Sequence, residues 1–244
     1  MSSNQVIGAE ALIRWNHSEK GLIPPGDFIP IAEDTQMIIP LGNWVVRETF
    51  SQLSAWNEYL SNSLSVSINI SAYQLMEHGF VDYVKSCLDE FKINPNNIEL
   101  ELTETAVMDD ISKTKKALDK LNTLGFKISI DDFGTGYSML SYLKKLPVNS
   151  LKIDLEFVRD LGKNDGSEMI VKSIIDLANN FKLTVIAEGV EEKEQEKFLL
   201  DNGCVLAQGY LYSKPLEPKI FIEFCQSRLP SLLAEPVKNN LNLP

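Results

Sequence analysis

The sequence predicts an α/β protein built around a parallel sheet, most simply a (β/α) barrel. Short apolar segments rich in β-branched residues alternate with longer segments of helical periodicity, which is the pattern of repeated βαβ units. Seven strand-like segments occur, close to the eight that a complete barrel needs. Polar side chains interrupt or end most of these segments. An open, doubly wound sheet is the structural alternative.

The expected strands are short, and each is placed by a run of apolar residues between turn or helix signals. They cover residues 5–14, 64–70, 97–103, 127–132, 150–154, 184–188 and 205–211. In a (β/α) barrel, functional side chains gather at the carboxyl ends of the strands. The polar residues near 131, 188 and 208 are therefore expected at one end of the barrel.

The expected helices fill the intervals between the strands. They cover residues 41–60, 79–91, 110–124, 137–145, 167–182, 191–201 and 217–228. In the third of these, Leu118, Leu121 and Leu124 recur at helical spacing, and Gly125 follows as a C-cap. Trp44, Phe50 and Trp56 also lie at helical spacing and are expected in the core.

The length favours one large α/β domain rather than several. No linker, internal repeat or low-complexity stretch divides the first 229 of the 244 residues. We therefore predict one domain over residues 1–229. Residues 230–244 are rich in Pro and Asn and are predicted to form a C-terminal tail.

Composition excludes several classes of protein. A net charge of −11 argues against a surface for nucleic-acid polymers, which is normally basic. Three scattered cysteines and two histidines do not suggest a disulfide framework or a His-rich zinc site. No apolar run is long enough to span a bilayer, and the N-terminus lacks the regions of a signal peptide. We therefore expect a soluble cytoplasmic protein.

Acidic and amide side chains recur once per strand-like segment, inside runs that are otherwise apolar. A buried charge is costly unless it is paired or bound to a metal, so a set of them at regular intervals suggests one shared, oxygen-lined site. Hard divalent cations such as Mg²⁺ and Mn²⁺ prefer such oxygen ligands. The residues are Glu10, Asn69, Glu101, Asp131, Asp132, Lys152, Asp154, Glu188 and Gln208.

Some of these residues also have simpler structural interpretations. The Asp131–Asp132 pair could cap a helix N-terminus, where Asp is favoured. For metal binding, a turn at Phe133–Gly134 would have to bring both carboxylates to one side of the strand. Glu101 alternates with Glu99, so both could lie on the solvated face of an edge strand.

Three further candidates are equally open to a structural interpretation. Asn69 could be a turn residue, although its side-chain oxygen is also a neutral metal ligand. Lys152 could pair with Asp154, whereas near two cations its pKa should fall and suit it to position water. Glu188 could cap a helix before Gly189, or act as a base within hydrogen-bond reach of a nucleophile.

An ordered set of motifs over roughly residues 5–220 resembles a known family, the EAL-domain phosphodiesterases of cyclic di-GMP. The set begins with Glu10-Ala11-Leu12 and follows the family's order. It consists of EALIRW, GLIPPGDFIPIAE, INISAYQL, ELELTET, ISIDDFGTGYSMLSYLKKLPVNSLKID, VIAEGVE and AQGYLYSKP. A lone EAL tripeptide would mean little, but DDFGTGYS together with LKID is highly specific.

The resemblance implies a TIM-like barrel whose first strand runs against the others, and an enzyme that uses two Mg²⁺ or Mn²⁺ ions. It implies hydrolysis of cyclic di-GMP, a bacterial second messenger, to linear 5′-pGpG. The implied metal ligands are Glu10, Asn69, Glu101, Asp131 and Asp132.

The resemblance also implies roles around the metals. Lys152 and Glu188 would hold or activate the attacking water, and Arg14, Gln208 and Asp154 would lie against the substrate. Arg14 could instead pair with a core carboxylate, although its planar fork suits phosphate oxygens. Glu104 would anchor the DFGTG loop, although it could also be an ordinary surface acid. In the family this loop lies near a dimer interface, so a homodimer is expected, and a sensory or cyclase domain could precede the chain in the native protein.

One departure from the family stands out. Members usually carry a further strand and helix before the EAL motif, and we expect both to be missing at this N-terminus, leaving an unpaired barrel edge. This departure favours one alternative to the enzyme, a catalytically impaired module that binds cyclic di-GMP or a protein. A metal-dependent phosphodiesterase for another substrate is a separate alternative.

Overall fold

A seven-stranded parallel sheet forms the centre of the molecule. The computed structural model describes residues 1, 5–56, 64–108, 110–135 and 139–228. Neighbouring strands all pair in parallel, in the order β1-β4-β5-β6-β7-β8-β9. The strands are β1 (Gly8–Ala11), β4 (Ser65–Asn69), β5 (Ile98–Thr103), β6 (Lys127–Phe133), β7 (Ser150–Ile153), β8 (Thr184–Ala187) and β9 (Leu206–Ala207).

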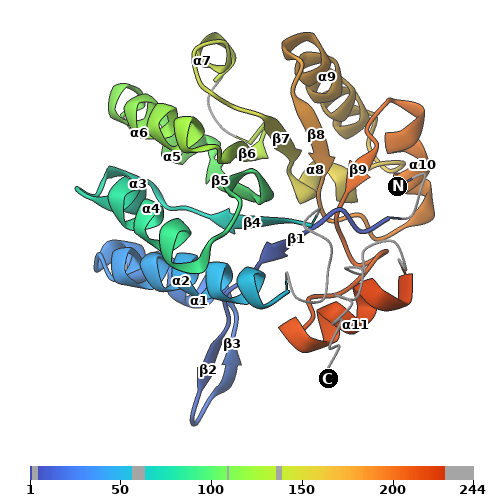
Figure 1. Ribbon diagram of the computed structural model, residues 1–244. Coiled ribbons are helices and arrows are strands. Elements are labelled where there is room, and N and C mark those ends of the chain that lie inside the picture. The colour runs from blue at the N-terminus through green and yellow to red at the C-terminus, as the bar shows by residue number, and fades with distance from the viewer. Residues whose placement is uncertain (2–4, 57–63, 109, 136–138, 229–244) are drawn as a thin grey trace, which may run out of the picture.

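The sheet curls into a partial TIM-like barrel with helices on its outside (Figure 1). Strand order follows the chain without reversal, whereas a doubly wound sheet reverses its order at a switch point. The prediction of a barrel-like α/β fold is therefore confirmed, and the doubly wound alternative is wrong. All seven expected strands are present within a few residues of their expected bounds.

The two edge strands of the barrel are β1 and β9, which each pair with one neighbour in the described part of the chain. Two contacts between side chains or termini lie across this opening. The Met1 amino group donates to the carbonyl oxygen of Val205 at 2.8 Å, and Gln208 Nε2 donates to Glu10 Oε2 at 2.9 Å. In a closed barrel, an eighth strand would pair in this opening.

Helices follow the strands as the periodicity predicts. The long ones are α2 (Ile38–Trp56), α4 (Phe80–Phe91), α6 (Ile111–Leu124), α9 (Asp165–Phe181), α10 (Lys193–Asp201) and α11 (Pro218–Arg228). Gly125 caps α6 with a φ of 102°, as expected. Of the helix expected over 137–145, α7 (Leu140–Leu143) is present, and residues 136–138 lie outside the described residues, as do 57–60 of the first expected helix.

Several short elements were not predicted. They are the hairpin β2 (Trp15–His17) and β3 (Gly21–Ile23), the helices α1 (Pro25–Asp34), α3 (Ala72–Met76), α5 (Glu104–Met108) and α8 (Leu155–Arg159), and the 3₁₀ turn η1 (Pro95–Asn97). Helix α1 begins at Pro25 and contains Pro30, and an internal Pro normally counts against a helix. The others are too short for a periodic signal.

Alternation along the strands separates an outer apolar face from an inner polar one. The apolar residues, such as Ile68, Leu100 and Ile130, are buried against the helices. Their neighbours in sequence point into the barrel, so the interior carries the polar groups. Phe50 and Trp56 are in the core as expected, but the expectation for Trp44 is wrong because its side chain is 53% exposed.

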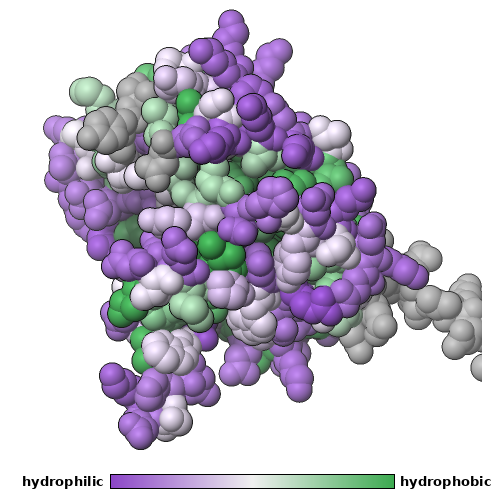
Figure 2. All heavy atoms as spheres, turned by 90° about the vertical axis from the view of Figure 1, so that its left-hand side faces the viewer, coloured by the Kyte–Doolittle hydropathy of each residue, from purple (hydrophilic) through white to green (hydrophobic). Residues whose placement is uncertain are grey.

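The outer surface is mainly hydrophilic. Figure 2 shows the face of α1 to α4, with scattered apolar residues and the hairpin β2–β3 projecting at its lower edge. No described helix combines the length and the apolar character that crossing a bilayer requires. The cysteines Cys87, Cys204 and Cys225 are free and buried. A cytoplasmic location, the domain boundary at residue 229 and the tail at 230–244 stay predictions, and the tail lies outside the described residues.

Candidate active site

The polar side chains singled out from the sequence converge at the carboxyl ends of the strands. Glu10, Asn69, Glu101, Asp131 and Lys152 lie on five neighbouring strands. Glu188 and Gln208 follow β8 and β9 directly. Register accounts for part of the convergence, because Asn69 pairs with Glu101, whereas Glu10 pairs with Ser67, two residues before Asn69.

Lys152 is the centre of this cluster. Its side chain is 1% exposed, and Nζ lies 2.8 Å from Glu101, 2.5 Å from Glu188, 3.3 Å from Asp131 and 3.6 Å from Glu10. The structural alternative in which Lys152 pairs with Asp154 is therefore wrong. One buried cation compensates four carboxylates in part, which leaves an excess of negative charge at the cluster.

Two amide side chains connect the carboxylates further. Asn69 Nδ2 donates to Glu10 Oε1 at 2.7 Å, and Gln208 Nε2 donates to both Glu10 and Glu188 at 2.9 and 2.8 Å. Gly209 was not recognised from the sequence. Its φ is 151°, and a Cβ there would lie about 2.3 Å from the backbone nitrogen of Val190, so a larger residue would displace the turn that holds Gln208.

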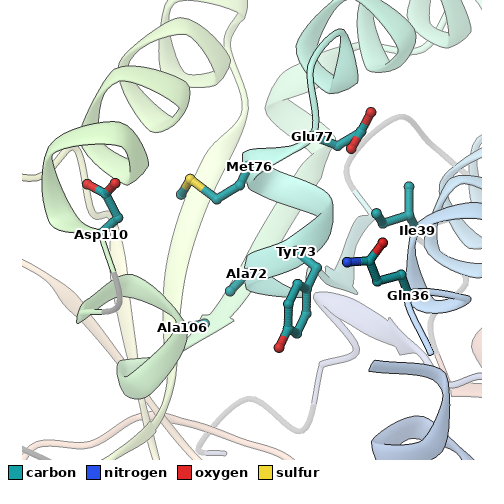
Figure 3. A pocket seen from close by; sticks show the side chains of 8 residues that line it. All are labelled: Gln36, Ile39, Ala72, Tyr73, Met76, Glu77, Ala106 and Asp110. Carbon is teal, nitrogen blue, oxygen red and sulfur yellow. The ribbon is translucent and has the colours of Figure 1, made fainter. Parts of the chain in front are cut away.

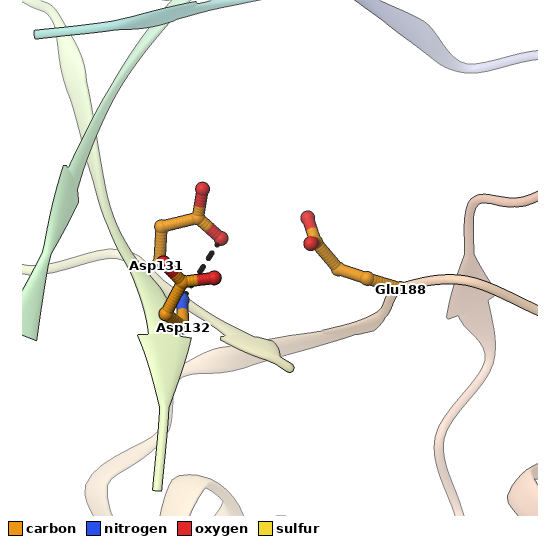
Figure 4. Close-up of side chains that lie close together, drawn as sticks. All are labelled: Asp131, Asp132 and Glu188. Carbon is orange, nitrogen blue, oxygen red and sulfur yellow. Dashed lines mark hydrogen bonds between the residues drawn. The ribbon is translucent and has the colours of Figure 1, made fainter. Parts of the chain in front are cut away.

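Asp131 and Asp132 approach the same point although they are adjacent in sequence (Figure 4). Asp132 has a left-handed φ of 52°, and the β6–β7 ladder shifts register between Ile130 and Phe133. The expected turn at Phe133–Gly134 is present, since the Thr135 backbone nitrogen donates to the Asp132 carbonyl oxygen at 3.4 Å and Gly134 has a φ of 103°. The left-handed Asp132 just before it is what directs both carboxylates to one side. No described helix begins at this pair, so the helix-cap interpretation is wrong.

Carboxylate oxygens of Asp131, Asp132 and Glu188 all lie within 4.8 Å of one another. Figure 4 shows the three groups pointing toward a common space between β6 and the end of β8. Glu101 is 2% exposed and inside the barrel, so it is not on a solvated edge strand. These oxygens, with the excess of negative charge, are a donor set that suits a hard divalent cation.

Burial shifts the acid groups toward their neutral forms. Desolvation raises the pKa of Glu101 to about 8 and that of Glu188 to about 7, although Lys152 opposes both shifts. Desolvation and the neighbouring Asp131 raise the pKa of Asp132 to about 6. The pKa of Lys152 is lowered by burial but raised more strongly by the surrounding carboxylates, so it ends well above its ordinary value. The lowered pKa expected for Lys152 beside two cations stays a prediction.

These pKa values predict how stability depends on pH without divalent cations. Because the carboxyl pKa values are higher in the folded chain, the folded protein binds more protons between about pH 5 and pH 8, and stability falls as pH rises through this window. We expect the midpoint of thermal unfolding in EDTA to drop by at least about 3 °C from pH 5 to pH 8. Saturating Mg²⁺ should abolish most of this drop, whereas a flat or rising profile in EDTA would contradict the shifts.

Of the three remaining candidates, Glu104 and Asp154 make contacts around the cluster, and Arg14 does not reach it. Glu104 is buried and accepts a hydrogen bond from the Met139 backbone nitrogen at 3.2 Å, at the far end of the DFGTG loop, of which residues 136–138 are not described. Asp154 caps α8 by accepting from the Glu156 backbone nitrogen and also interacts with Asp132. Arg14 is not brought into the cluster, since its exposed side chain donates to the Ile13 carbonyl oxygen.

A separate recess of about 390 Å³ lies beside the barrel mouth (Figure 3). It is lined by residues of α3, α5 and the segment around α1–α2, among them Gln36, Tyr73, Met76 and Asp110. It contains none of the clustered carboxylates, so the recess and the acid cluster are distinct features.

The chain is similar to known proteins over most of its length. A family model described as "EAL domain" matches residues 1–215. The chain is 41% identical over 211 residues to the bifunctional diguanylate cyclase/cyclic di-GMP phosphodiesterase MucR of Pseudomonas aeruginosa, covering 86% of this chain and 31% of MucR. It is 39% identical over 217 residues to the cyclic di-GMP phosphodiesterase PdeR of Escherichia coli, covering 89% of this chain and 33% of PdeR.

A solved structure described as the MucR phosphodiesterase in complex with c-di-GMP is also similar. Its TM-score is 0.85 at 40% identity, covering 88% of this chain and 87% of that chain. The chain spans about a third of the length of the curated relatives it matches.

Proposed function

Since the chain belongs to the EAL domain family, we propose that it is a metal-dependent phosphodiesterase that hydrolyses cyclic di-GMP to linear 5′-pGpG. The observation that supports this most is the convergence of four carboxylates, three from strands and one from the residue after β8, on one buried lysine. Relatives at about 40% identity that are named cyclic di-GMP phosphodiesterases give the substrate class.

Two divalent cations, Mg²⁺ or Mn²⁺, fit the donor set. Bound cations would neutralise phosphate charge and activate water. The candidate ligands are all oxygen donors, and the oxygens of Asp131, Asp132 and Glu188, which lie within 4.8 Å of one another, suit a divalent cation. The proposed ligands are Glu10, Asn69, Glu101, Asp131 and Asp132.

Lys152 and Glu188 are proposed to handle the attacking water. In the reaction, the water oxygen bonds to phosphorus and the bond from phosphorus to the 3′ oxygen breaks, which leaves a 5′ phosphate. Glu188 lies at the open end of the cluster, where its carboxylate can accept a proton from the attacking water. The 2.5 Å contact with Lys152 Nζ fixes the Glu188 carboxylate, and the ammonium can hold the water by donating to it.

Substrate contacts are proposed for three residues around the cluster. Gln208 bridges Glu10 and Glu188 and so places its amide at the edge of the site. Asp154 lies beside Asp132 at the start of α8. The Arg14 side chain would have to turn from its present contact with Ile13 to bind a phosphate oxygen, where its planar fork is suited to the ligand.

Glu104 is proposed to anchor the loop that follows Asp132. Its bond to Met139 fixes the exit of that loop. We further propose that this loop takes part in a homodimer, and that the chain acts together with further domains, as the multidomain relatives suggest. Lowering the cyclic di-GMP level would then be the physiological role.

Removal of divalent cations is expected to abolish turnover. Protein stripped with EDTA should hydrolyse cyclic di-GMP at less than about 1% of the rate of the protein reloaded with Mn²⁺, because the substrate phosphate would face several carboxylates of its own sign. Hydrolysis is followed by chromatography, with Ca²⁺ and Zn²⁺ as comparison ions. Turnover that survives the chelator would refute the metal-dependent mechanism. Binding without turnover in Mn²⁺ would support the receptor alternative.

A further inference from the structure

A second side-chain contact crosses the barrel interior one layer below the acid cluster. The Ser150 hydroxyl on β7 donates a hydrogen bond to the Glu99 carboxylate on β5. Both residues lie two positions before a cluster residue, Lys152 and Glu101, and therefore point into the barrel as those do. The pairs Glu99–Ser150 and Glu101–Lys152 thus join the same two strands at successive layers, with β6 between them.

The backbone ladder is irregular at the level of Lys152. Strands β6 and β7 pair regularly at Ser129–Ser150 and Ile130–Leu151, and the next pair is Phe133–Ile153. The register shift between them accommodates Asp131 and Asp132. At the level of Lys152 the regular backbone pairing between β7 and β6 is interrupted. On the opposite edge of β7, the pairing with β8 is regular.

In the layer that contains Glu99 and Ser150 the β6–β7 ladder is still regular, and the register shift follows Ile130–Leu151, toward the site. The side chains around Glu99 and Ser150 in the interior are small or polar. By register, Glu99 lies beside Ser67 on β4, and Ser150 lies beside Ser129 on β6 and Thr184 on β8. Most (β/α) barrels fill this space with branched apolar side chains. The hydrogen bond from Ser150 to Glu99 links β5 and β7 directly beneath the site.

We propose that Glu99 and Ser150 are positioning residues, which hold β7 at the separation from β5 at which Lys152 meets Glu101 and Glu188. This inference rests on the proposed function for its kinetic test. Cation binding provides a test that does not depend on the substrate.

The kinetic test compares variants that break the bond with one that keeps it. Ser150→Ala and Glu99→Leu should each lower kcat about tenfold and change KM less than about twofold, because the reacting groups are misplaced while substrate contacts remain. Glu99→Gln keeps an acceptor oxygen and should retain at least about half of wild-type kcat. The double variant Glu99→Leu/Ser150→Ala should be no worse than either single one, since both remove the same bond.

Ser65→Ala is the matched control. Ser65 is a half-buried interior hydroxyl, and it donates to the Asn97 carbonyl oxygen at the far end of the barrel, so its loss should leave kcat unchanged. Wild-type kcat in Ser150→Ala would overturn the proposal. An equal loss in Glu99→Gln and Glu99→Leu would also overturn it, because charge and not position would then be responsible.

Calorimetric titration with Mn²⁺ separates this inference from the proposed function. Ser150→Ala and Glu99→Leu should weaken Mn²⁺ binding at least about threefold relative to wild type, Glu99→Gln and Ser65→Ala. This ranking should hold even if wild-type protein does not hydrolyse cyclic di-GMP, in which case the proposed function alone would fail. Identical Mn²⁺ affinity in all variants would overturn the positioning role.

Discussion

Replacing Asp131 by Asn is expected to lower kcat for cyclic di-GMP at least about a thousandfold while the fold is retained. Asp131 lies within reach of Asp132, Glu188 and Lys152, so its carboxylate is the group most central to the proposed cation sites. An amide of the same size keeps the packing but removes the charge that a divalent cation requires. The loss should appear mainly in kcat, measured with saturating Mn²⁺.

Asp89→Asn is the control for this substitution. Asp89 lies exposed on α4, and removing its charge changes the net charge of the protein by the same amount. Its kcat should equal that of wild type. Retained turnover in Asp131→Asn, at more than about a tenth of the wild-type rate, would contradict the assignment of Asp131 as a metal ligand.

Replacing Lys152 by Met should both abolish turnover and destabilise the cation-free protein. Lys152 is fully buried and contacts four carboxylates, and removing one partner of a buried charge cluster costs about 3–5 kcal/mol. Part of that cost can be avoided if Glu101 or Glu188 binds a proton. The free energy of unfolding is measured by urea denaturation at pH 8 in EDTA, where the carboxylates are most fully charged.

Added Mn²⁺ distinguishes the two roles of Lys152. A bound cation should restore much of the lost stability, because it replaces the missing positive charge, but it should not restore turnover. Lys144→Met, on the exposed surface, should change neither quantity. Unchanged stability of Lys152→Met in EDTA at pH 8 would contradict the charge balance described for the cluster.

The sequence predicted the strands well because most of them combine an apolar outer face with polar residues inside the barrel. Glu101 and Asp131 could be recognised as site residues for this reason, since a charge within a β-branched run needs a partner. The residues with which these two carboxylates pair could not be predicted. The contact between Lys152 and Glu101 joins residues 51 positions apart, and its existence depends on the curvature of the sheet.

Most structural features that could not be predicted from the sequence depend on local backbone conformation. The left-handed φ of Asp132 is uncommon for a residue other than Gly. The sequence therefore predicted the turn at Phe133–Gly134 but not the backbone conformation that brings the two adjacent carboxylates to one point. The hairpin after Arg14 and the Pro-containing helix α1 gave no periodic signal. The direction of the Arg14 side chain depends on rotamers that an exposed residue is free to change.

The most direct test of the central claim is the identity of the product formed from cyclic di-GMP. The 244-residue chain is incubated with Mn²⁺ and cyclic di-GMP, and the nucleotides are separated by chromatography and identified by mass spectrometry. The account predicts linear pGpG with its phosphate on the 5′ end, formed in multiple turnovers and absent with Asp131→Asn. Intact cyclic di-GMP after many hours with folded, Mn²⁺-loaded protein would contradict it.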